Sequence, residues 1–200
     1  FISTTRAADT TPDAFEFEDQ DDVERNTVIT SNEITVSGIE VAVPISVTGG
    51  EYSINNGAWT SSAGTVENGD KVRVRHTSSS SFSTSVNTVL TIGGVSDTFT
   101  STTRAPITTP EGFSFDPLTD VEPGQVQVSN AITVTGIEVA VAISVANGEY
   151  QINDGGWTST AGTVNAGDQV RVRHTSSSNF ETTVTTTLTI GGVSADFKTT

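Results

Sequence analysis

A histidine followed closely by serines is the first place in this chain where side chains of a catalytic type lie together. His76 precedes Ser78, Ser79 and Ser80, and Asp70 lies shortly before it. A serine, a histidine and a carboxylate can serve as the nucleophile, base and orienting acid of a hydrolase. Neighbours on an extended strand point to alternate faces, however, and the sequence contains no nucleophile elbow. We therefore predict a structural histidine and no catalytic residues.

Metal binding requires a different set of side chains. The chain has no cysteine and two histidines, so a zinc site would need carboxylates from distant loops. Calcium prefers oxygen ligands, and one dense acidic run suits it better: Glu16, Glu18, Asp19, Asp21, Asp22 and Glu24. The run lacks the regular ligand spacing of an EF-hand loop, which favours a solvated loop. We expect no cofactor, and calcium is the one metal that the sequence suggests testing.

Aromatic and basic side chains offer two binding surfaces. Trp59 with Tyr52, and Trp157 in the second half, could form a platform for sugar rings, although a tryptophan in a small β-sandwich is more often a core anchor. We expect both tryptophans to be buried.

Two arginines alternate with valines in each half of the chain, as Arg73 and Arg75 and as Arg171 and Arg173. They point outward and predict either cross-strand salt bridges or an electrostatic contact with a neighbouring module.

The segments that must position these residues occur twice in the sequence. The nine residues Val72–Ser80 return without change as Val170–Ser178, 98 residues later, and no insertion or deletion separates the copies. We predict that residues 8–102 form one repeat and residues 103–200 a second one.

The first residues follow the same register. Phe1–Thr4 corresponds to Phe99–Thr102 at the end of the first repeat, so residues 1–7 resemble the last strand and linker of a preceding copy. We expect either a segment of a longer tandem array or a subunit that donates this strand to a neighbour.

Alternating apolar and polar residues predict strands throughout each copy. Ile39, Val41, Val43, Ile45 and Val47 alternate with polar or small residues, which predicts one buried and one solvated face. In the repeated stretch, Val72 and Val74 point inward, and His76 shares their side. This stretch is expected to be a central strand.

Three smaller features refine the strand prediction. Phe15 and Phe17 are two residues apart and predict a short first strand. Asn56-Gly57 predicts a tight hairpin. Asp97 has the parity of the apolar Val95 and Phe99, which predicts a bulge or strand end there.

These patterns, without a helical period anywhere, predict an all-β fold of two tandem immunoglobulin-like or fibronectin III-like antiparallel β-sandwiches. The hydrophobic fraction of 34% fits strands with one solvated face. A net charge of −15 repels phosphate backbones and anionic lipid, so we expect no nucleic-acid partner. No stretch has the roughly 20 apolar residues that a membrane helix needs, so we expect no membrane insertion in this segment.

Five segments, together with Phe99, resemble tandem repeats of large bacterial secreted or surface-attached proteins: Thr11–Phe15, Thr30–Asn32, Ile34–Ile39, Val72–Ser79 and Leu90–Val95. The resemblance covers essentially the whole chain. It implies an extracellular or cell-surface location and a stalk, adhesin or fibre role. The partners expected from it are neighbouring copies of the repeat and a surface or polysaccharide ligand. Many relatives carry a cysteine pair that this chain lacks.

The sequence therefore predicts a non-enzymatic structural repeat of a bacterial extracellular stalk, adhesin or fibre, which could polymerise by strand donation. The alternative is a carbohydrate-binding module that uses Trp59 and Trp157.

Overall fold

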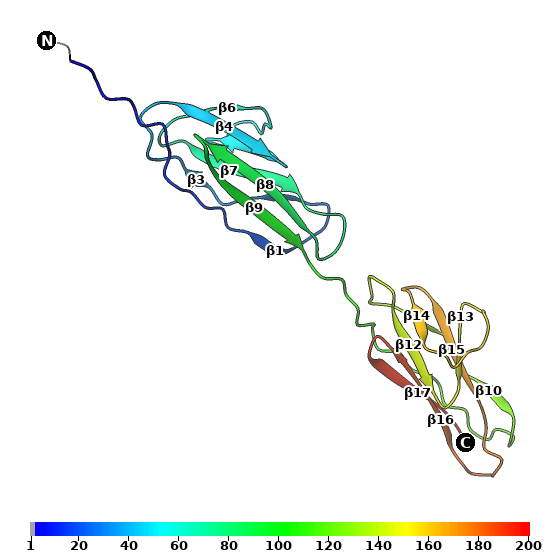
Figure 1. The fold of residues 1–200 in the computed structure, drawn as a ribbon. Helices are drawn as coiled ribbons and strands as arrows, with labels where there is room; N and C mark the ends of the chain where they lie inside the picture. The colour runs from blue at the N-terminus through cyan, green and yellow to red at the C-terminus, as the bar shows by residue number, and fades with distance from the viewer. Residues whose placement is uncertain (1–2) are drawn as a thin grey trace. The chain divides into compact units, whose positions relative to one another are not determined.

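A computed structural model describes residues 3–200, and these residues form strands joined by turns and loops (Figure 1). The chain divides into two compact units, Phe1–Ala105 and Pro106–Thr200. Among the described residues, none belongs to a helix of the length and apolar character needed to cross a membrane. Phe1 and Ile2, half of the predicted donor strand, lie outside the described residues.

From residue 3 onward, the first unit has nine strands. They are β1 (Gln20–Val23), β2 (Val28–Thr30), β3 (Ile34–Thr35), β4 (Val43–Thr48), β5 (Glu51–Ile54), β6 (Gly64–Val66), β7 (Lys71–Thr77), β8 (Ser85–Ile92) and β9 (Val95–Thr103). One sheet has the order β1-β9-β8-β4-β6. In the other sheet, β2 and β3 pair with one edge of β7 and β5 pairs with its other edge. All pairs are antiparallel except β1 with β9.

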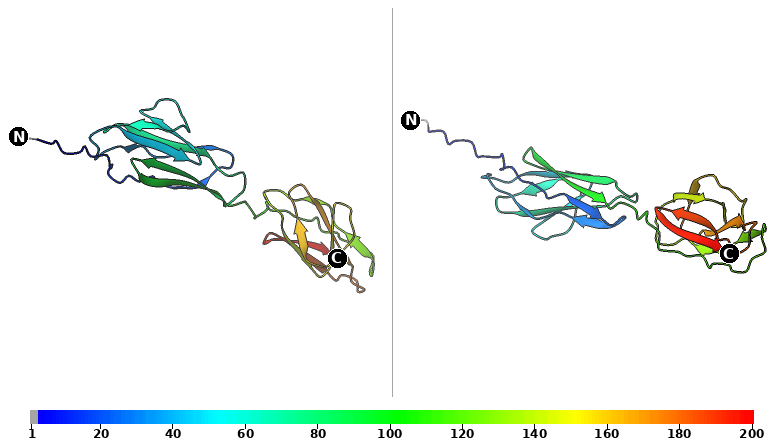
Figure 2. Two further views of the ribbon diagram at one scale, coloured as in Figure 1. Left: turned by 45° about the horizontal axis from the view of Figure 1, so that its top comes forward. Right: turned by 90° about the horizontal axis from the view of Figure 1, so that it is seen from below.

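The second unit repeats this plan with eight strands. They are β10 (Val126–Val128), β11 (Ile132–Thr133), β12 (Val141–Ala146), β13 (Glu149–Ile152), β14 (Gly162–Val164), β15 (Gln169–Thr175), β16 (Val184–Ile190) and β17 (Val193–Thr199). The sheets are β14-β12-β16-β17 and β10/β11-β15-β13. Figure 2 shows each unit from two further directions. Both units are immunoglobulin-like antiparallel sandwiches, as the alternation predicted.

In the second unit, where every residue is described, the segment equivalent to β1 does not form a strand. Pro117 and Leu118 stand where Asp19 and Gln20 stand in the first unit, and a single parallel bridge joins Leu118 to Thr199. Leu118 and Val121 nevertheless form backbone hydrogen bonds with Lys198 and Thr200, in the register in which Gln20 and Val23 face β9.

Each core lies between its two sheets. In the first unit, the most completely buried side chains include Phe99, Ile45, Leu90, Val72 and Val74. The two valines come from β7, which has partners on both edges, so the prediction of a central strand in the repeated stretch is confirmed.

Two strand predictions are wrong at the residue level. Phe15 and Phe17 do pack on the same core, but their segment is not a strand, because Phe17 donates its backbone N–H to the Asp97 carboxylate rather than to a neighbouring backbone. The run that begins at Ile39 becomes a strand only at Val43. Val41 precedes that strand and is 46% exposed.

Asp97 does not mark a bulge. It pairs with Leu90 in an unbroken register from Ile92↔Val95 to Ser85↔Thr102. A carboxylate is tolerated at this half-buried position because Asp97 Oδ2 accepts the Phe17 N–H at 2.6 Å. The hairpin after β5 is also displaced by one residue from the prediction, because Asn55 and Asn56 have the positive φ values of the turn (50° and 59°).

Candidate functional site

His76 is buried in a set of hydroxyl groups between the two sheets of the first unit. It lies on β7, is 6% exposed, and its ring centroid is 5.1 Å from that of Phe99. Its Nδ1 is 2.8 Å from Thr88 Oγ1, and its Nε2 is 2.7 Å from Ser101 Oγ. The prediction that His76 lies on the valine side of the strand is therefore confirmed, and two hydroxyl groups hold its ring.

The hydrogen bonds around His76 define one consistent protonation state. Thr88 Oγ1 donates to the Gly49 carbonyl at 3.2 Å, so it accepts from the ring, and Nδ1 carries the proton. Nε2 then accepts the hydroxyl hydrogen of Ser101. Burial lowers the pKa of His76 below its ordinary value, which keeps the imidazole neutral.

The second unit preserves this arrangement. His174 Nδ1 is 2.7 Å from Thr186 Oγ1, and its Nε2 is 2.8 Å from Thr199 Oγ1. Thr199 replaces Ser101 and keeps the hydroxyl group. Burial also lowers the pKa of His174. Period-two alternation predicts the side of the strand on which the histidine lies, but it does not identify the hydroxyl partners. The available signal was Thr88, a polar residue at an inward position of its strand that recurs as Thr186.

The other members of the hydrolase hypothesis do not join His76. Ser78 is buried, donates to the Glu24 carbonyl at 2.6 Å and accepts the Thr27 N–H at 3.0 Å. The Asp70 carboxylate accepts hydrogen bonds from the Asn55 side chain and the Glu67 backbone, both at 2.8 Å. These contacts give His76 and Ser78 structural roles and place the carboxylate in a turn.

Trp59 is not a core residue, so the predicted burial is wrong. It is half-buried on the outer face of the β5–β7 sheet, and the guanidinium carbon of Arg75 lies 4.4 Å from its ring centroid. Arg75 also forms a salt bridge with Glu51 at 2.8 Å. A tryptophan beside the outward face of β7 is stabilised by stacking with this arginine rather than by the core.

Trp157 repeats this geometry in the second unit. It is half-buried, lies 4.5 Å from the Arg173 guanidinium carbon, and Arg173 pairs with Glu149 at 2.7 Å. Each unit thus carries an outward-facing glutamate–arginine–tryptophan triplet: Glu51, Arg75 and Trp59, or Glu149, Arg173 and Trp157.

An open groove lies beside each triplet. In the first unit its lining includes Gly50, Glu51, Ser61 and Arg75, and its volume is about 460 Å³. The equivalent groove of the second unit has a volume of about 490 Å³. Trp59 does not line this groove; it lines a separate hollow of about 100 Å³ together with Glu33 and Arg73.

Arg73, the other arginine of β7, forms a surface ion pair. Arg73 lies 3.2 Å from Glu33, and Lys71 lies 3.1 Å from the same carboxylate. The hydrogen bond from Lys71, supported by the charge of Arg73, lowers the pKa of Glu33. Cross-strand pairing thus accounts for Arg73 and Arg75. Ala131 replaces Glu33 in the second unit, so this pair is specific to the first.

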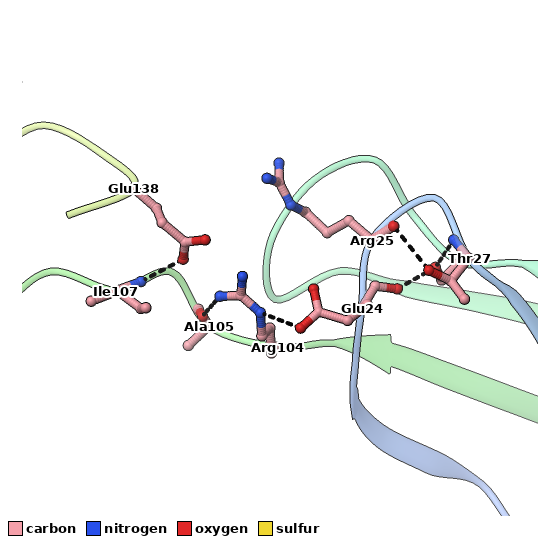
Figure 3. Close-up of polar contacts among 8 residues, drawn as sticks. Glu24, Arg25, Thr27, Arg104, Ala105, Ile107 and Glu138 are labelled. Carbon is pink, nitrogen blue, oxygen red and sulfur yellow. Dashed lines mark hydrogen bonds and ion pairs between the residues drawn. The ribbon is translucent and has the colours of Figure 1, made fainter. Parts of the chain in front are cut away.

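The acidic run between Glu16 and Glu24 connects the first loop to β9 and to Arg104 instead of surrounding a cation. Asp19 Oδ1 accepts the Thr100 N–H at 2.7 Å, Asp21 and Asp22 lie within β1, and Glu24 pairs with Arg104 at 3.0 Å (Figure 3). Within residues 3–200, no three histidine, aspartate or glutamate side chains are placed together as a metal would need. The predicted solvated loop is in fact partly a strand.

Comparisons with known proteins identify no family. No protein-family model matches the chain. No curated protein matches it either. Among solved structures it is similar to the I9–I11 tandem from titin (12% identity, TM-score 0.30) and to the titin I-band fragment I67–I69 (9%, 0.32). Each alignment covers 97% of this chain and 65% or 64%, respectively, of the titin fragment.

An endo-fucoidan hydrolase from glycoside hydrolase family 107 aligns with 98% of this chain but with only 29% of its own length, at 10% identity and a TM-score of 0.27. The chain spans slightly less than two thirds of the titin fragments. At these identities and scores the likenesses assign no activity, and the fold assignment rests on the strand order.

Proposed function

We propose that this chain is a non-enzymatic structural repeat of a bacterial extracellular stalk, adhesin or fibre, and that each unit transmits tension along its length. The observation that carries the proposal is the path of the chain through the first unit. Pro12 packs against Gly93, at the turn between β8 and β9. Thr103 donates its N–H to Thr84 O, at the opposite end of the same hairpin. Tension applied through the two flanking linkers therefore acts along β9.

The contacts of β9 resist such tension together. Gln20 and Val23 of β1 pair in parallel with Ser101 and Thr103 of β9. Force that pulls the two parallel strands in opposite directions loads their hydrogen bonds at the same time instead of opening them one by one. Asp97 and Asp19 extend this interface through their bonds to Phe17 and Thr100.

The second unit has backbone hydrogen bonds in the same register between its first loop and β17. Leu118 donates its N–H to Lys198 O, and Thr200 donates to Leu118 O, both at 3.0 Å. Val121 donates to Thr200 O at 3.2 Å.

Ala195 and Pro117 replace Asp97 and Asp19, so the two side-chain hydrogen bonds of the first interface have no counterpart. We therefore expect the second unit to rupture at a lower force than the first.

Single-molecule pulling tests the proposal. The chain has no native cysteine, so Ser3→Cys and Thr200→Cys can supply two specific handles. We expect two rupture peaks, each followed by an extension of roughly 280 Å from about 90 released residues. Asp19→Ala with Asp97→Ala is expected to lower the peak of the first unit, while the second unit is an internal control. Extension without a resolvable peak would contradict the proposal.

Strand donation is the less favoured form of the proposal. The position equivalent to Phe1 is filled in each unit by the chain's own Phe99 or Phe197, and both are fully buried. A donated strand would have to displace β9 or β17. We therefore propose that neighbouring copies are joined through linkers, at the bacterial cell surface and outside the cell.

Carbohydrate binding is the second candidate function, and the partly exposed tryptophan of each triplet supports it. The half-buried indole leaves surface for a sugar ring, and Glu51 and Arg75 offer hydrogen-bonding groups. A polysaccharide array probed with wild-type chain and with a Trp59→Ala, Trp157→Ala double variant tests it. Binding that both proteins share, or no binding at all, would remove this candidate.

A further inference from the structure

His76 joins the two sheets of the first unit at the strand that the proposed tension loads. It lies on β7, whereas the hydroxyl groups that its ring nitrogens contact come from β8 and β9 of the other sheet. Its Nε2 is 2.7 Å from Ser101 Oγ, and its ring centroid is 5.1 Å from that of Phe99. Both of these β9 residues are fully buried. One histidine therefore holds β9 to the opposite sheet through a hydrogen bond and a ring contact.

Ser101 is at the same time a backbone partner of β1. Gln20 pairs in parallel with Ser101, and Val23 pairs with Thr103. Ser101 thus contacts the parallel strand through its main chain and the histidine through its side chain. Because it lies two residues before the end of β9, tension from the linker that follows Thr103 reaches it early.

The second unit repeats this coincidence of contacts. Leu118 forms a parallel bridge with Thr199, and His174 Nε2 is 2.8 Å from Oγ1 of the same threonine. The ring centroids of His174 and Phe197 are 4.9 Å apart. In each unit, therefore, the residue of the last strand that pairs with β1, or with its equivalent segment, is also the residue that binds the buried histidine.

A hydrogen bond between two sheets responds to sliding differently from the apolar contacts around it. Apolar side chains lose contact gradually as they move past one another, whereas a hydrogen bond is lost within a displacement of about 1 Å. Water cannot replace the bond while Ser101 stays buried, so the first sliding of β9 leaves the ring nitrogen and the hydroxyl without partners. Resistance of this kind is concentrated at one position along the strand.

We propose that the buried histidine of each unit is a positioning residue for mechanical resistance. By accepting a hydrogen bond from Ser101 or Thr199, it holds the last strand of its unit in place. This inference rests on the proposed function, because it requires tension that acts along β9 or β17. In the first unit the direction of the bond is set on the other side of the ring, where Nδ1 of His76 donates to Thr88 Oγ1 at 2.8 Å. Nε2 is thereby left as an acceptor for the Ser101 hydroxyl.

Serine variants of the full chain separate this role from an ordinary contribution to stability. Ser101→Ala removes the hydroxyl that binds His76, and Ser101→Val removes it while keeping the shape of a threonine. Ser101→Thr keeps a hydroxyl, as Thr199 does in the second unit. The matched control is Ser31→Ala, which removes a buried hydroxyl that accepts the Val74 N–H at 3.0 Å in the sheet without β9.

The measured quantity is the lifetime of the folded first unit under constant force, with the Ser3→Cys and Thr200→Cys handles. About ten glycine and serine residues inserted after Phe180, in an exposed loop of the second unit, lengthen the extension that this unit releases by roughly 35 Å. The rupture with the shorter extension is then that of the first unit. Urea unfolding of each variant gives its equilibrium stability.

We expect Ser101→Ala and Ser101→Val to shorten the lifetime of the first unit roughly tenfold, because the lost bond is one that breaks before rupture. Ser101→Thr should keep the lifetime within about threefold of wild type. Ser31→Ala should lower the urea midpoint as Ser101→Ala does but leave the lifetime unchanged, because its contact is still intact when β9 begins to slide.

Equal shortening by Ser101→Ala and Ser31→Ala would overturn the assignment, because the lifetime would then follow stability alone. An unchanged lifetime in Ser101→Ala, or equal lifetimes for Ser101→Val and Ser101→Thr, would overturn it as well. A wild-type chain that extends without resolvable ruptures contradicts the proposed function instead, so the two failures are distinguishable.

Discussion

Asp97 and Ala195 occupy equivalent positions in the two units and provide a reciprocal test of how the first loop is held. Asp97 Oδ2 accepts the Phe17 N–H at 2.6 Å from half-buried surroundings. A hydrogen bond to a charged group contributes about 1.5–3 kcal/mol, and the partial exposure of this carboxylate favours the lower end of that range. We expect Asp97→Ala to destabilise the first unit by about 1.5 kcal/mol.

A loss of this size corresponds to a decrease of roughly 6–12 °C in the melting midpoint of a domain of this length. Thermal unfolding followed by amide signals of β9 measures the first unit separately from the second. Asp97→Asn keeps an oxygen acceptor without the charge and should lose less than Asp97→Ala.

The reverse change, Ala195→Asp, places a carboxylate where it can accept the Phe115 N–H. We expect it to raise the midpoint of the second unit. An Asp97→Ala midpoint within about 1 °C of wild type would refute the argument, because it would mean that the Phe17 N–H gains as much from water as from the carboxylate.

Three further predictions test other contacts. Because burial lowers the pKa of His76, the unfolded chain takes up protons before the folded chain does, so urea-measured stability should be constant above about pH 6.5 and should fall below it. Stability that stays constant down to pH 5 would contradict a neutral buried ring. Arg75→Ala should shift Trp59 emission to longer wavelength and change stability by less than about 1 kcal/mol, since both partners are partly solvated; an unshifted spectrum would argue against stacking. Gly50→Ala should cost about 1–3 kcal/mol or more, because its Cβ would lie 2.4 Å from Arg75 O, whereas Gly112→Ala, with no atom within 4 Å, is the matched control; equal denaturation midpoints would show that the backbone relaxes.

The sequence was sufficient to predict what depends on local alternation and on comparison of the two copies. Val72, Val74 and His76 follow from period-two alternation along one strand, and their centrality follows from the unchanged stretch around them. The sandwich class likewise follows from short alternating segments separated by turns. These inferences need only neighbours in the sequence.

The errors arise where a residue's environment is set by a distant partner. Alternation within one strand does not carry across a turn, so it could not show that Trp59 lies on the arginine face of β7. The Asp97 position was misjudged because its partner, Phe17, is 80 residues away and contributes a backbone N–H that no side-chain pattern reveals. The exposed Val41 shows the same limit, since alternation continues through a bend.

Comparison of the two units also shows that buried contacts are retained more strictly than surface contacts. The buried histidine network is retained even where a residue changes, because Thr199 supplies the hydroxyl that Ser101 supplies in the first unit. Surface contacts vary more freely: Ala131 replaces Glu33, which removes the partner of Arg73. This contrast is expected of a scaffold, because its core packing must be preserved while its surface residues can vary.

The glutamate–arginine–tryptophan triplet departs from that contrast, because it faces outward and is nonetheless retained with nearly equal distances in both units. Its ion pair and stacking contribute little to stability at a partly solvated site, so folding alone gives weak reason for keeping all three residues. If the repeat binds a ligand, we expect that ligand to contact the face that carries the triplet. A chain that binds no polysaccharide, and whose stability falls by several kcal/mol when Arg75 is truncated, would instead make the triplet part of the scaffold.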